Sequence, residues 1–150
     1  MITDTIKDLA LLSIEHRVNS LEDAENSKPY AKRSTLYVAR LAPTNYKPYL
    51  FTPVWAVGCS LGLKPRPSFG HITSIEDSTL HAIRSTLHWE VSCPILPGNS
   101  GGPVYDGRTY EVIGIAVWVK VYNGQLVTTM AGVVPITEIY EFMEGYKRLQ

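Results

Sequence analysis

One serine, Ser100, lies within a run of small residues that reads PGNSGGPV over positions 97–104. Glycines on both sides of a serine let the backbone turn tightly and let a substrate approach the hydroxyl. In such a turn the backbone N–H groups of Gly98 and Ser100 can converge on one point, and a developing oxyanion needs a fixed pair of donors of this kind. The segment is therefore suited to acyl transfer with Ser100 as the nucleophile. A glycine-rich hairpin with an exposed serine is the alternative that involves no chemistry.

This string resembles the nucleophile signature of trypsin-like serine peptidases, and in detail that of the HtrA/Deg branch, which also reads proline-glycine-asparagine-serine-glycine-glycine-proline. Residues 58–63 and 69–75 are similar to the family's glycine-anchored turn and the strand that follows it. Residues 112–115 and 132–136 look like the strand after the nucleophile and the strand that closes the specificity pocket. The resemblance covers about residues 50–140 and implies the complete second barrel of the chymotrypsin fold.

The resemblance implies a serine endopeptidase that hydrolyses peptide bonds through an acyl-enzyme on Ser100, with the oxyanion hole at Gly98, Asn99 and Ser100. It also implies a polypeptide substrate and no need for a cofactor or a metal. Digestive enzymes of the family carry an aspartate at the position of Asn99, where it pairs with a freed N-terminus. Because an amide cannot form that ion pair, activation by N-terminal cleavage is not expected here.

Asp8 is the second residue that the resemblance assigns to the catalytic triad. Residues 4–12, which read DTIKDLALL, are similar to the strand that ends the family's first barrel and carries the triad aspartate. An aspartate in that place orients the histidine and stabilises the imidazolium, and a carboxylate on the N-terminal surface is the alternative. Periodicity alone leaves residues 7–15 open between a buried strand and part of an amphipathic helix, and the resemblance favours the strand.

The histidine of the triad is missing from its expected place. The family carries this general base upstream of the aspartate, but none of the seven residues before Asp8 is a histidine. The histidines of the chain all follow Asp8, and nothing in the sequence places any of them between Asp8 and Ser100. A Ser-His-Asp site that lacks its histidine loses about 10⁶ in turnover. The histidines are His16, His71, His81 and His88.

Three interpretations of this gap remain open. The chain is a part of a longer protein whose upstream half holds the histidine, or it is one piece of a split enzyme that a second chain completes. Alternatively, it is a catalytically inactive peptidase-like barrel that serves as a binding or structural module in a larger assembly. The intact oxyanion segment and the Asp8 segment favour the first two interpretations.

The resemblance also places a substrate pocket next to Ser100. Its expected lining carries no charge, so a basic substrate side chain would meet no counter-ion, and small or aliphatic side chains are expected instead. Residues 115–117 are further expected to pair with the substrate backbone as an added strand. The pocket residues are Pro94, Ile115, Ala116, Val117, Gly132 and Val133.

Short β-prone segments, separated mostly by turns rich in glycine and proline, must position these residues. Asp106-Gly107 and Asn123-Gly124 stand between apolar runs and are good hairpin signals. Short strands with turn signals at regular spacing are typical of a barrel or a sandwich. The expected strands are residues 35–41, 49–57, 68–75, 80–84, 87–92, 111–121 and 125–134.

The C-terminal end differs, because apolar residues recur there at helical spacing. Thr137 is suited to cap the N-terminus of this helix. Together with the resemblance, these segments predict an all-β, chymotrypsin-like protein with a C-terminal α-helix. Residues 1–34 are expected to be a remnant of the first barrel with a linker, and residues 35–150 the complete second β-barrel with the helix. The periodic residues are Ile136, Ile139, Tyr140, Met143 and Tyr146.

Composition argues against several other classes of function. The chain has 14 basic and 14 acidic side chains without a basic block, which argues against binding to nucleic acid or to an anionic membrane. Its longest apolar run is 8 residues, far below the roughly 20 that a membrane helix needs. The first residues show no signal-peptide pattern, and the sequence does not specify a compartment.

Cysteines and tryptophans are expected to have structural rather than chemical roles. Cys59 and Cys93 are too few for a disulfide framework or for a zinc site, and we expect both to be free thiols. Trp55, Trp89 and Trp118 are expected in the core or at the rim of the barrel rather than at a ligand site.

Overall fold

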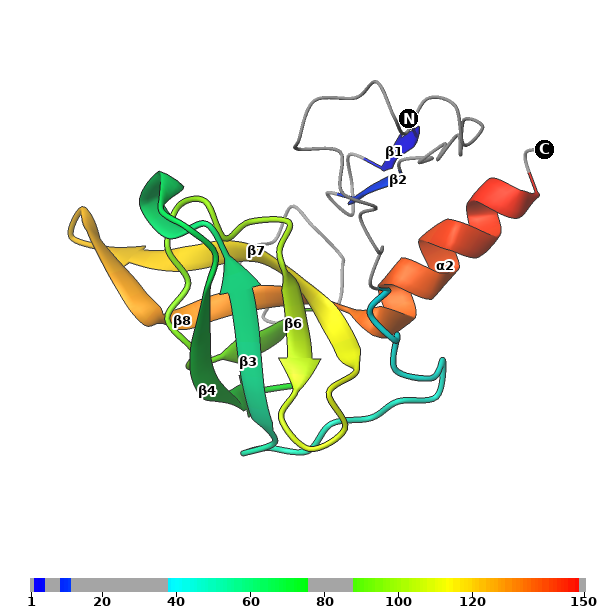
Figure 1. Cartoon of the computed structure of the whole chain (residues 1–150), viewed down its shortest axis with the longest axis horizontal. Helices are drawn as coiled ribbons and strands as arrows, with labels where there is room; N and C mark the ends of the chain where they lie inside the picture. The colour runs from blue at the N-terminus through cyan, green and yellow to red at the C-terminus, as the bar shows by residue number, and fades with distance from the viewer. Residues whose placement is uncertain (1, 5–8, 12–37, 76–87, 149–150) are drawn as a thin grey trace, which may run out of the picture.

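The computed structural model describes residues 2–4, 9–11, 38–75 and 88–148 of the chain. Six strands close into a barrel in the order β3-β4-β5-β8-β7-β6, and every strand pairs antiparallel with two neighbours (Figure 1). The predicted class, an all-β barrel with a C-terminal helix, is confirmed. The barrel strands are β3 (Pro53–Gly58), β4 (Arg66–Ser74), β5 (Trp89–Val91), β6 (Pro103–Asp106), β7 (Val112–Tyr122) and β8 (Gln125–Pro135).

Predicted strands at 68–75, 87–92, 111–121 and 125–134 are confirmed as β4, β5, β7 and β8, with ends shifted by a few residues. The strand predicted at 49–57 begins later, at Pro53, because Thr52 N–H donates to the Tyr49 carbonyl (3.0 Å) and closes a turn. Proline fits the first position of a strand, where the missing N–H costs no ladder bond. The segment expected at 80–84 lies outside the described residues.

Two features of the barrel differ from the sequence-based prediction. Strand β6 was not predicted, because its four residues directly follow the nucleophile segment and are too few to show alternation. The strand expected at 35–41 is not formed by its described part, residues 38–41, which make one isolated parallel bridge, Leu41 to Val112. Hydrogen bonds from Ala42 N–H to Val112 (2.9 Å) and from Val112 N–H to Arg40 (2.8 Å) hold this segment against β7.

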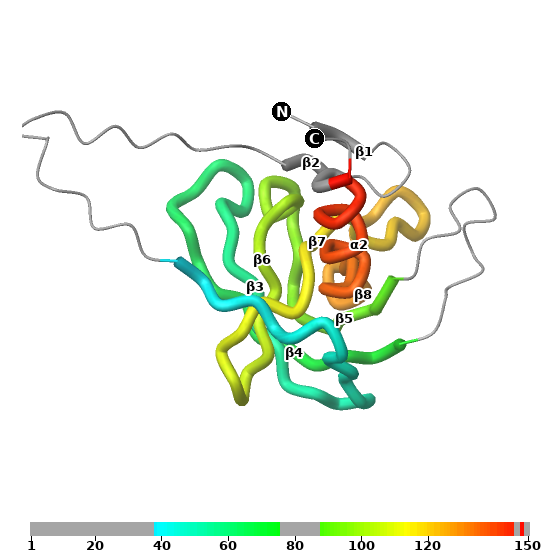
Figure 2. Tube along the Cα trace, turned by 90° about the vertical axis from the view of Figure 1, so that its right-hand side faces the viewer, coloured from blue at the N-terminus to red at the C-terminus, as the bar shows by residue number. Residues whose placement is uncertain are grey.

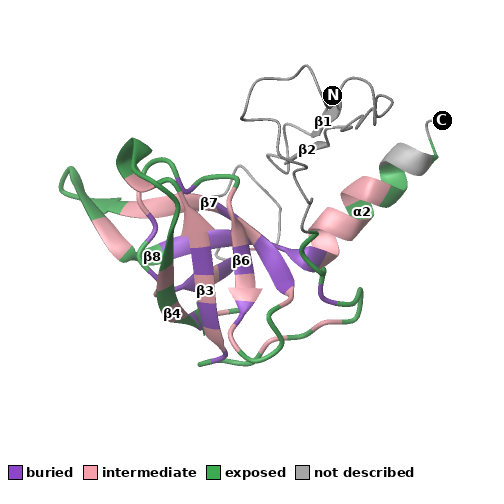
Figure 3. Ribbon diagram, viewed as in Figure 1, coloured by how far each residue is buried: buried purple, intermediate pink, exposed green. Residues whose placement is uncertain are grey.

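Apolar side chains fill the barrel interior. Buried and less buried residues alternate along β3 (Figure 3), and likewise along β5 and β6, whereas residues 112–114 of β7 and 131–135 of β8 are buried in succession. This alternation follows from the period of two along a β-strand. Each of the six strands contributes at least one fully or nearly fully buried side chain, so closure of the sheet creates one shared core. The inward residues of the strands are Val54, Ala56, Ile72, Trp89, Val91, Val104, Ile113, Ala116, Ala131 and Val133.

Helix α2 (Ile136–Lys147) follows β8 directly and packs beside β7 and β8 (Figure 2). Ile136 is fully buried in the barrel core, and Ile139 and Tyr140 pack against that core, as the helical spacing predicted. The prediction of Thr137 as the N-cap is wrong, because the helix already begins at Ile136. Among the described helices, none is long and apolar enough to span a membrane.

Two short strands precede the barrel: β1 (Ile2–Asp4) and β2 (Leu9–Leu11). They pair antiparallel as a separate two-stranded sheet, in which Ile2 lies opposite Leu11. Leu9–Leu11 was open between strand and helix by periodicity, and the strand favoured by the resemblance is what forms.

A buried carboxylate, Asp106, ties the hairpin between β6 and β7 to the chain that enters the barrel. Asp106 is fully buried and accepts hydrogen bonds from Tyr46 (2.7 Å) and from the backbone, Nε and Nη2 of Arg108 (2.7, 3.0 and 2.6 Å). Burial alone would raise the pKa of Asp106, but these hydrogen bonds and the Arg108 charge lower it to about 2. Arg108 also donates to the Tyr49 hydroxyl (2.8 Å). The cluster therefore holds an ionised carboxylate inside the fold.

Candidate active site

Ser100 lies in the loop between β5 and β6, and hydrogen bonds attach this loop to two neighbours. Leu61 N–H, in the 3₁₀ turn η1 (Ser60–Gly62), donates to the Pro97 carbonyl (2.7 Å). On the other side, Gly101 N–H donates to the Ala116 carbonyl (2.8 Å) and Ala116 N–H donates to the Gly102 carbonyl (3.0 Å). Because η1 connects two barrel strands, β3 and β4, and Ala116 lies on a third, β7, hydrogen bonds hold the backbone on either side of Ser100 to the barrel.

Gly98 has a backbone conformation that only glycine accepts readily. Its φ is 99°, and a Cβ atom added there would lie 2.4 Å from the Cys59 carbonyl oxygen. Asn99 N–H donates to the Leu96 carbonyl (3.0 Å), whereas the N–H groups of Gly98 and Ser100 donate to no other described residue. Of the segment 98–100, these two N–H groups are therefore the ones available to an oxyanion, and the amide of Asn99 is already used.

The Asn99 side chain anchors the loop from inside. It is 1% exposed, and its Oδ1 accepts a hydrogen bond from Ser60 Oγ (2.6 Å). Its Nδ2 is buried and has no partner among the described residues. A Cβ atom at Gly58 would lie 2.8 Å from the Asn99 backbone, so the end of β3 approaches the loop closely. The residue before the nucleophile is thus held between β3 and η1.

Ser100 itself is exposed, and its hydroxyl donates to the carbonyl oxygen of Val117 on β7 (3.2 Å). Strand β7 pairs with β6 only as far as Ile115, so the carbonyl side of residue 117 is free to face the loop. A serine hydroxyl has one proton to donate, and in this structure that proton goes to a backbone carbonyl rather than to a base.

The histidines do not complete a triad within the described residues. His71 is exposed on β4 and pairs with Pro53, whereas Asn99, the residue before Ser100, contacts Gly58 at the other end of β3, about 17 Å along the strand. His88 directly precedes β5. Asp8, His16 and His81 lie outside the described residues, so the aspartate assigned by the resemblance stays a prediction.

Among the described residues, no group of three or more His, Cys, Asp or Glu could hold a metal ion.

The six residues expected to line a substrate pocket do not all face one space. Ala116 and Val133 are 1% and 0% exposed, and their side chains belong to the barrel core. Only their backbone atoms could therefore line a pocket, and their place in one stays a prediction. Pro94 is exposed, and Ile115 and Val117 are half-buried. Gly132 is covered by the indole of Trp118. The sequence predicted Trp118 only as a residue of the core or rim of the barrel.

The contact between Trp118 and Gly132 was not predicted, because the register between β7 and β8 shifts next to Trp118. Ala116 lies opposite Val133, but Trp118 lies opposite Gly132, so Val117 is an extra residue in a β-bulge. A bulge exchanges the faces on which the following side chains lie, and no local sequence signal specified it.

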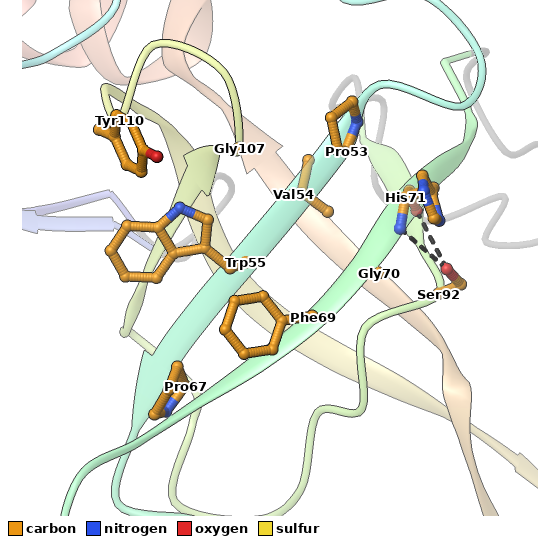
Figure 4. Close-up of a pocket in the computed structure, with 10 residues that line it drawn as sticks. All are labelled: Pro53, Val54, Trp55, Pro67, Phe69, Gly70, His71, Ser92, Gly107 and Tyr110. Carbon is orange, nitrogen blue, oxygen red and sulfur yellow. Dashed lines mark hydrogen bonds between the residues drawn. The ribbon is translucent and has the colours of Figure 1, made fainter.

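A separate groove of about 790 Å³ lies on the outer face of β3 and β4, next to the turn that follows β6 (Figure 4). Trp55 lies in it and stacks on Tyr105 with ring centroids 4.0 Å apart, and Phe69 is 70% exposed at its edge. The lining includes no residue of the segment 97–102, so this groove is distinct from the candidate active site.

Cys59 and Cys93 are both free, as predicted. Cys59 is exposed in the turn before η1, and Cys93 is buried in the barrel core. Burial raises the pKa of the Cys93 thiol to about 11. Neither cysteine takes part in the hydrogen bonds of the Ser100 hydroxyl.

Comparison with known proteins agrees with this geometry. Residues 2–115 match the family model of the trypsin-like peptidase domain. Protease Do-like 2, chloroplastic, from Arabidopsis thaliana is 32% identical over 80 residues, which are 53% of this chain and 13% of that protein. The HtrA-type protease AlgW, as a serine-to-alanine variant with a decapeptide, matches with a TM-score of 0.64 at 19% identity, covering 73% of this chain and 32% of that chain.

The serine endoprotease from Yersinia pestis has a similar structure, with a TM-score of 0.60 at 21% identity over 77% of this chain and 37% of that chain. These structural likenesses confirm the predicted chymotrypsin-like fold. The chain spans about a third of the length of the solved structures that it matches and about an eighth of the curated relative.

Proposed function

The chain belongs to the trypsin-like peptidase domain family, with relatives in the HtrA/Deg branch, and we propose that it is the nucleophile-bearing part of a serine endopeptidase. The observation that carries this proposal is the loop around Ser100. An exposed hydroxyl lies there next to two N–H groups, of Gly98 and Ser100, that donate to no other described residue. Such donors stabilise an oxyanion because they are held in place before charge develops.

In the proposed reaction, Ser100 Oγ attacks the carbonyl carbon of a peptide bond and its proton passes to a histidine. The negative charge moves to the carbonyl oxygen, which accepts hydrogen bonds from Gly98 and Ser100 N–H. Collapse of this intermediate breaks the C–N bond, and the leaving amine takes the proton from the imidazolium. A water molecule then hydrolyses the acyl ester by the same steps. For Ser100 to react, its hydroxyl must first leave the Val117 carbonyl.

The histidine is proposed to come from a part of the protein outside these 150 residues or from a second chain. Asp8 is proposed to orient it, on the resemblance of residues 4–12 to the family's triad-aspartate strand. The substrate is proposed to be a polypeptide, and AlgW, a structural neighbour, is described with bound peptides. No metal or cofactor enters the proposed chemistry.

A small alkyl fluorophosphonate tests the proposal, because it phosphonylates serines that are activated as nucleophiles. The probe is applied to the chain alone and to the chain with any polypeptide that copurifies with it, and the adduct is located by mass spectrometry. We expect an adduct on Ser100 in the complemented sample and about 10⁶-fold slower labelling in the chain alone. A Ser100→Ala variant is the control that must show no adduct.

The second candidate function is an inactive barrel that acts as a binding or assembly module. The hydrogen bond from Ser100 Oγ to the Val117 carbonyl favours it, because a hydroxyl engaged with the backbone is not poised for attack. Absence of any Ser100 adduct in both samples, with the fold intact by circular dichroism, would exclude the peptidase and leave this module as the function.

A further inference from the structure

The turn η1 makes two hydrogen bonds to the loop that carries Ser100. Leu61 N–H donates to the Pro97 carbonyl (2.7 Å), and Ser60 Oγ donates to Oδ1 of Asn99 (2.6 Å). The first bond joins two backbones and can form whatever the side chains are. The second depends on the side chain at position 60, so a substitution there removes it without altering the backbone groups of either segment.

The backbone of the loop fixes the directions of the two N–H groups that are proposed to bind the oxyanion. All described peptide bonds are trans, so an N–H points away from the carbonyl of the same peptide unit. Because the Pro97 carbonyl faces η1, the N–H of Gly98 points away from η1. The Asn99 carbonyl accepts a hydrogen bond from Gly102 N–H (2.9 Å), so the N–H of Ser100 points away from that bond. Residue 99 lies between the two donors, and its backbone angles contribute to their mutual orientation.

The side chain of Asn99 is buried and depends on Ser60. Only 1% of Asn99 is exposed, so its amide is shielded from bulk water. Among the described residues its Nδ2 has no partner, and the bond from Ser60 to Oδ1 is the one hydrogen bond that the side-chain amide makes. A buried acceptor that is left without a partner is costly. Without the Ser60 hydroxyl, we expect the side chain to turn towards other donors and to carry the backbone of residue 99 with it.

Backbone strain in η1 is a second observation that links this turn to the loop. Leu61 has a φ of 55°, in the left-handed region that is unfavourable for a residue with a side chain. Its side chain is 66% exposed, so burial of the leucine does not offset this cost. Strain of this kind persists where surrounding contacts hold it, and it gathers at functional sites. The bond from Leu61 to the Pro97 carbonyl holds the strained turn against the segment that carries the oxyanion donors.

We propose that Ser60 is a positioning residue of the active site, whose hydroxyl acts through Asn99 to hold both oxyanion donors in the orientation that binds the oxyanion. This inference rests on the proposed peptidase function and adds a residue to its machinery. In this role Ser60 contacts neither the substrate nor the reacting atoms. Its loss should therefore slow the chemical step and leave the binding of a substrate or probe unchanged.

Saturation kinetics with the alkyl fluorophosphonate test this role, because they separate binding of the probe from its reaction with Ser100. In that reaction Ser100 Oγ attacks phosphorus, a P–O bond forms, the P–F bond breaks, and fluoride and the serine proton are released. The chain is used together with its copurifying polypeptide. We expect Ser60→Ala to lower the limiting labelling rate by about 10- to 100-fold, at or below the roughly 10²- to 10³-fold cost of losing one donor outright. The probe concentration that gives half of the limiting rate should not change.

Two variants of the same shape isolate the hydroxyl. Ser60→Thr keeps it on a half-buried position and should label at close to the wild-type rate. Ser60→Val has the shape of threonine without the hydroxyl, should lose as much as Ser60→Ala, and serves as the second variant if Ser60→Ala does not fold. The matched control is Ser92→Ala, which removes a serine hydroxyl that accepts from His71 N–H (2.9 Å) on the outer groove, and it should leave the limiting rate unchanged.

A double-mutant cycle tests whether Ser60 acts through Asn99. In an Asn99→Ala background, Ser60→Ala should lower the limiting rate no further, because the acceptor of its hydroxyl is already gone. A full additional loss in that background would overturn the proposed role.

The remaining outcomes separate the role of Ser60 from the peptidase function. If the wild type is labelled at Ser100 but Ser60→Ala, folded by circular dichroism, has an unchanged limiting rate, the role of Ser60 is wrong and the peptidase stands. Equal losses in Ser60→Thr and Ser60→Val would overturn the role of Ser60 in the same way. If the fluorophosphonate leaves Ser100 of the wild type unlabelled, the peptidase function fails, and the proposed positioning role fails with it.

Discussion

Replacement of Asp106 by asparagine removes a charge from the barrel while keeping the size and shape of the side chain. Asp106 is fully buried, and the hydrogen bonds that it accepts come from Tyr46 and Arg108. In Asp106→Asn the amide keeps one acceptor oxygen, but its NH₂ group faces donors that need an acceptor. The Arg108 side chain is 42% exposed and can turn towards water, so the variant should still fold.

The size of the effect follows from the pKa of Asp106, which lies at about 2 in the fold and at 3.8 when unperturbed. At 1.36 kcal/mol per pKa unit, the ionised form contributes about 2 kcal/mol to stability at neutral pH. Because the folded pKa is the lower one, this contribution is fully present above pH 4 and is lost as the pH falls through about 2. The variant should therefore lose about 2 kcal/mol at pH 7 and much less at pH 2.

Urea unfolding, followed by circular dichroism between pH 7 and pH 2, measures this difference. Glu144→Gln, which removes an exposed carboxylate from α2, is the matched control and should shift the unfolding free energy by less than about 0.5 kcal/mol. A deficit in Asp106→Asn that is the same at pH 7 and pH 2 would refute the reasoning, because it would come from lost packing or geometry rather than from charge. A deficit near zero at pH 7 would refute it as well.

Three further outcomes are expected. Gly98→Ala should slow fluorophosphonate labelling of Ser100 by about 10²- to 10³-fold with unchanged circular dichroism, since its Cβ would collide with the Cys59 carbonyl and turn the oxyanion donor away; an unchanged rate would contradict the assigned donor. Gly132→Ala should lower the free energy of urea unfolding by about 1–3 kcal/mol in the wild type, because the new Cβ would collide with the indole of Trp118. In a Trp118→Ala background the same substitution should cost much less, and additive effects of the two substitutions would disprove the contact between Trp118 and Gly132. A thiol reagent at pH 8 should titrate one cysteine, Cys59, in the native protein and two after unfolding, because the second is buried with a pKa of about 11; two rapid reactions would contradict this.

Local sequence signals were sufficient for several elements of this fold, including the β7–β8 hairpin and α2. Asn123-Gly124 predicted the turn between β7 and β8, where both residues have the positive φ values, 50° and 76°, that a two-residue hairpin needs. Helical spacing of apolar residues predicted α2. The spacing is regular because one face of the helix packs on the barrel core, beginning with the fully buried Ile136. The glycine pattern around Ser100 predicted a constrained loop, since a φ of 99° at Gly98 is strained for any residue with a side chain.

Interactions between distant segments were beyond local signals. The bond from Ser100 to Val117 depends on the bulge in β7, and the period of two says which residues share a face only while the register is regular. The same applies to Trp118, which pairs with Gly132 only because of that bulge. Tyr46 and Asp106 are 60 residues apart, and no spacing rule links them. They meet where the segment before β3 lies against the β6–β7 hairpin.

Closure of the barrel has a thermodynamic consequence for its association with the domain or chain that is proposed to supply the histidine. Because β6 pairs with β3 and completes the ring, the sheet that frames the Ser100 loop needs no strand from elsewhere. Such a union would be docking between two folded bodies, without the large heat-capacity change and ordering cost of coupled folding and binding. Its affinity would then depend on the fit of two preformed surfaces.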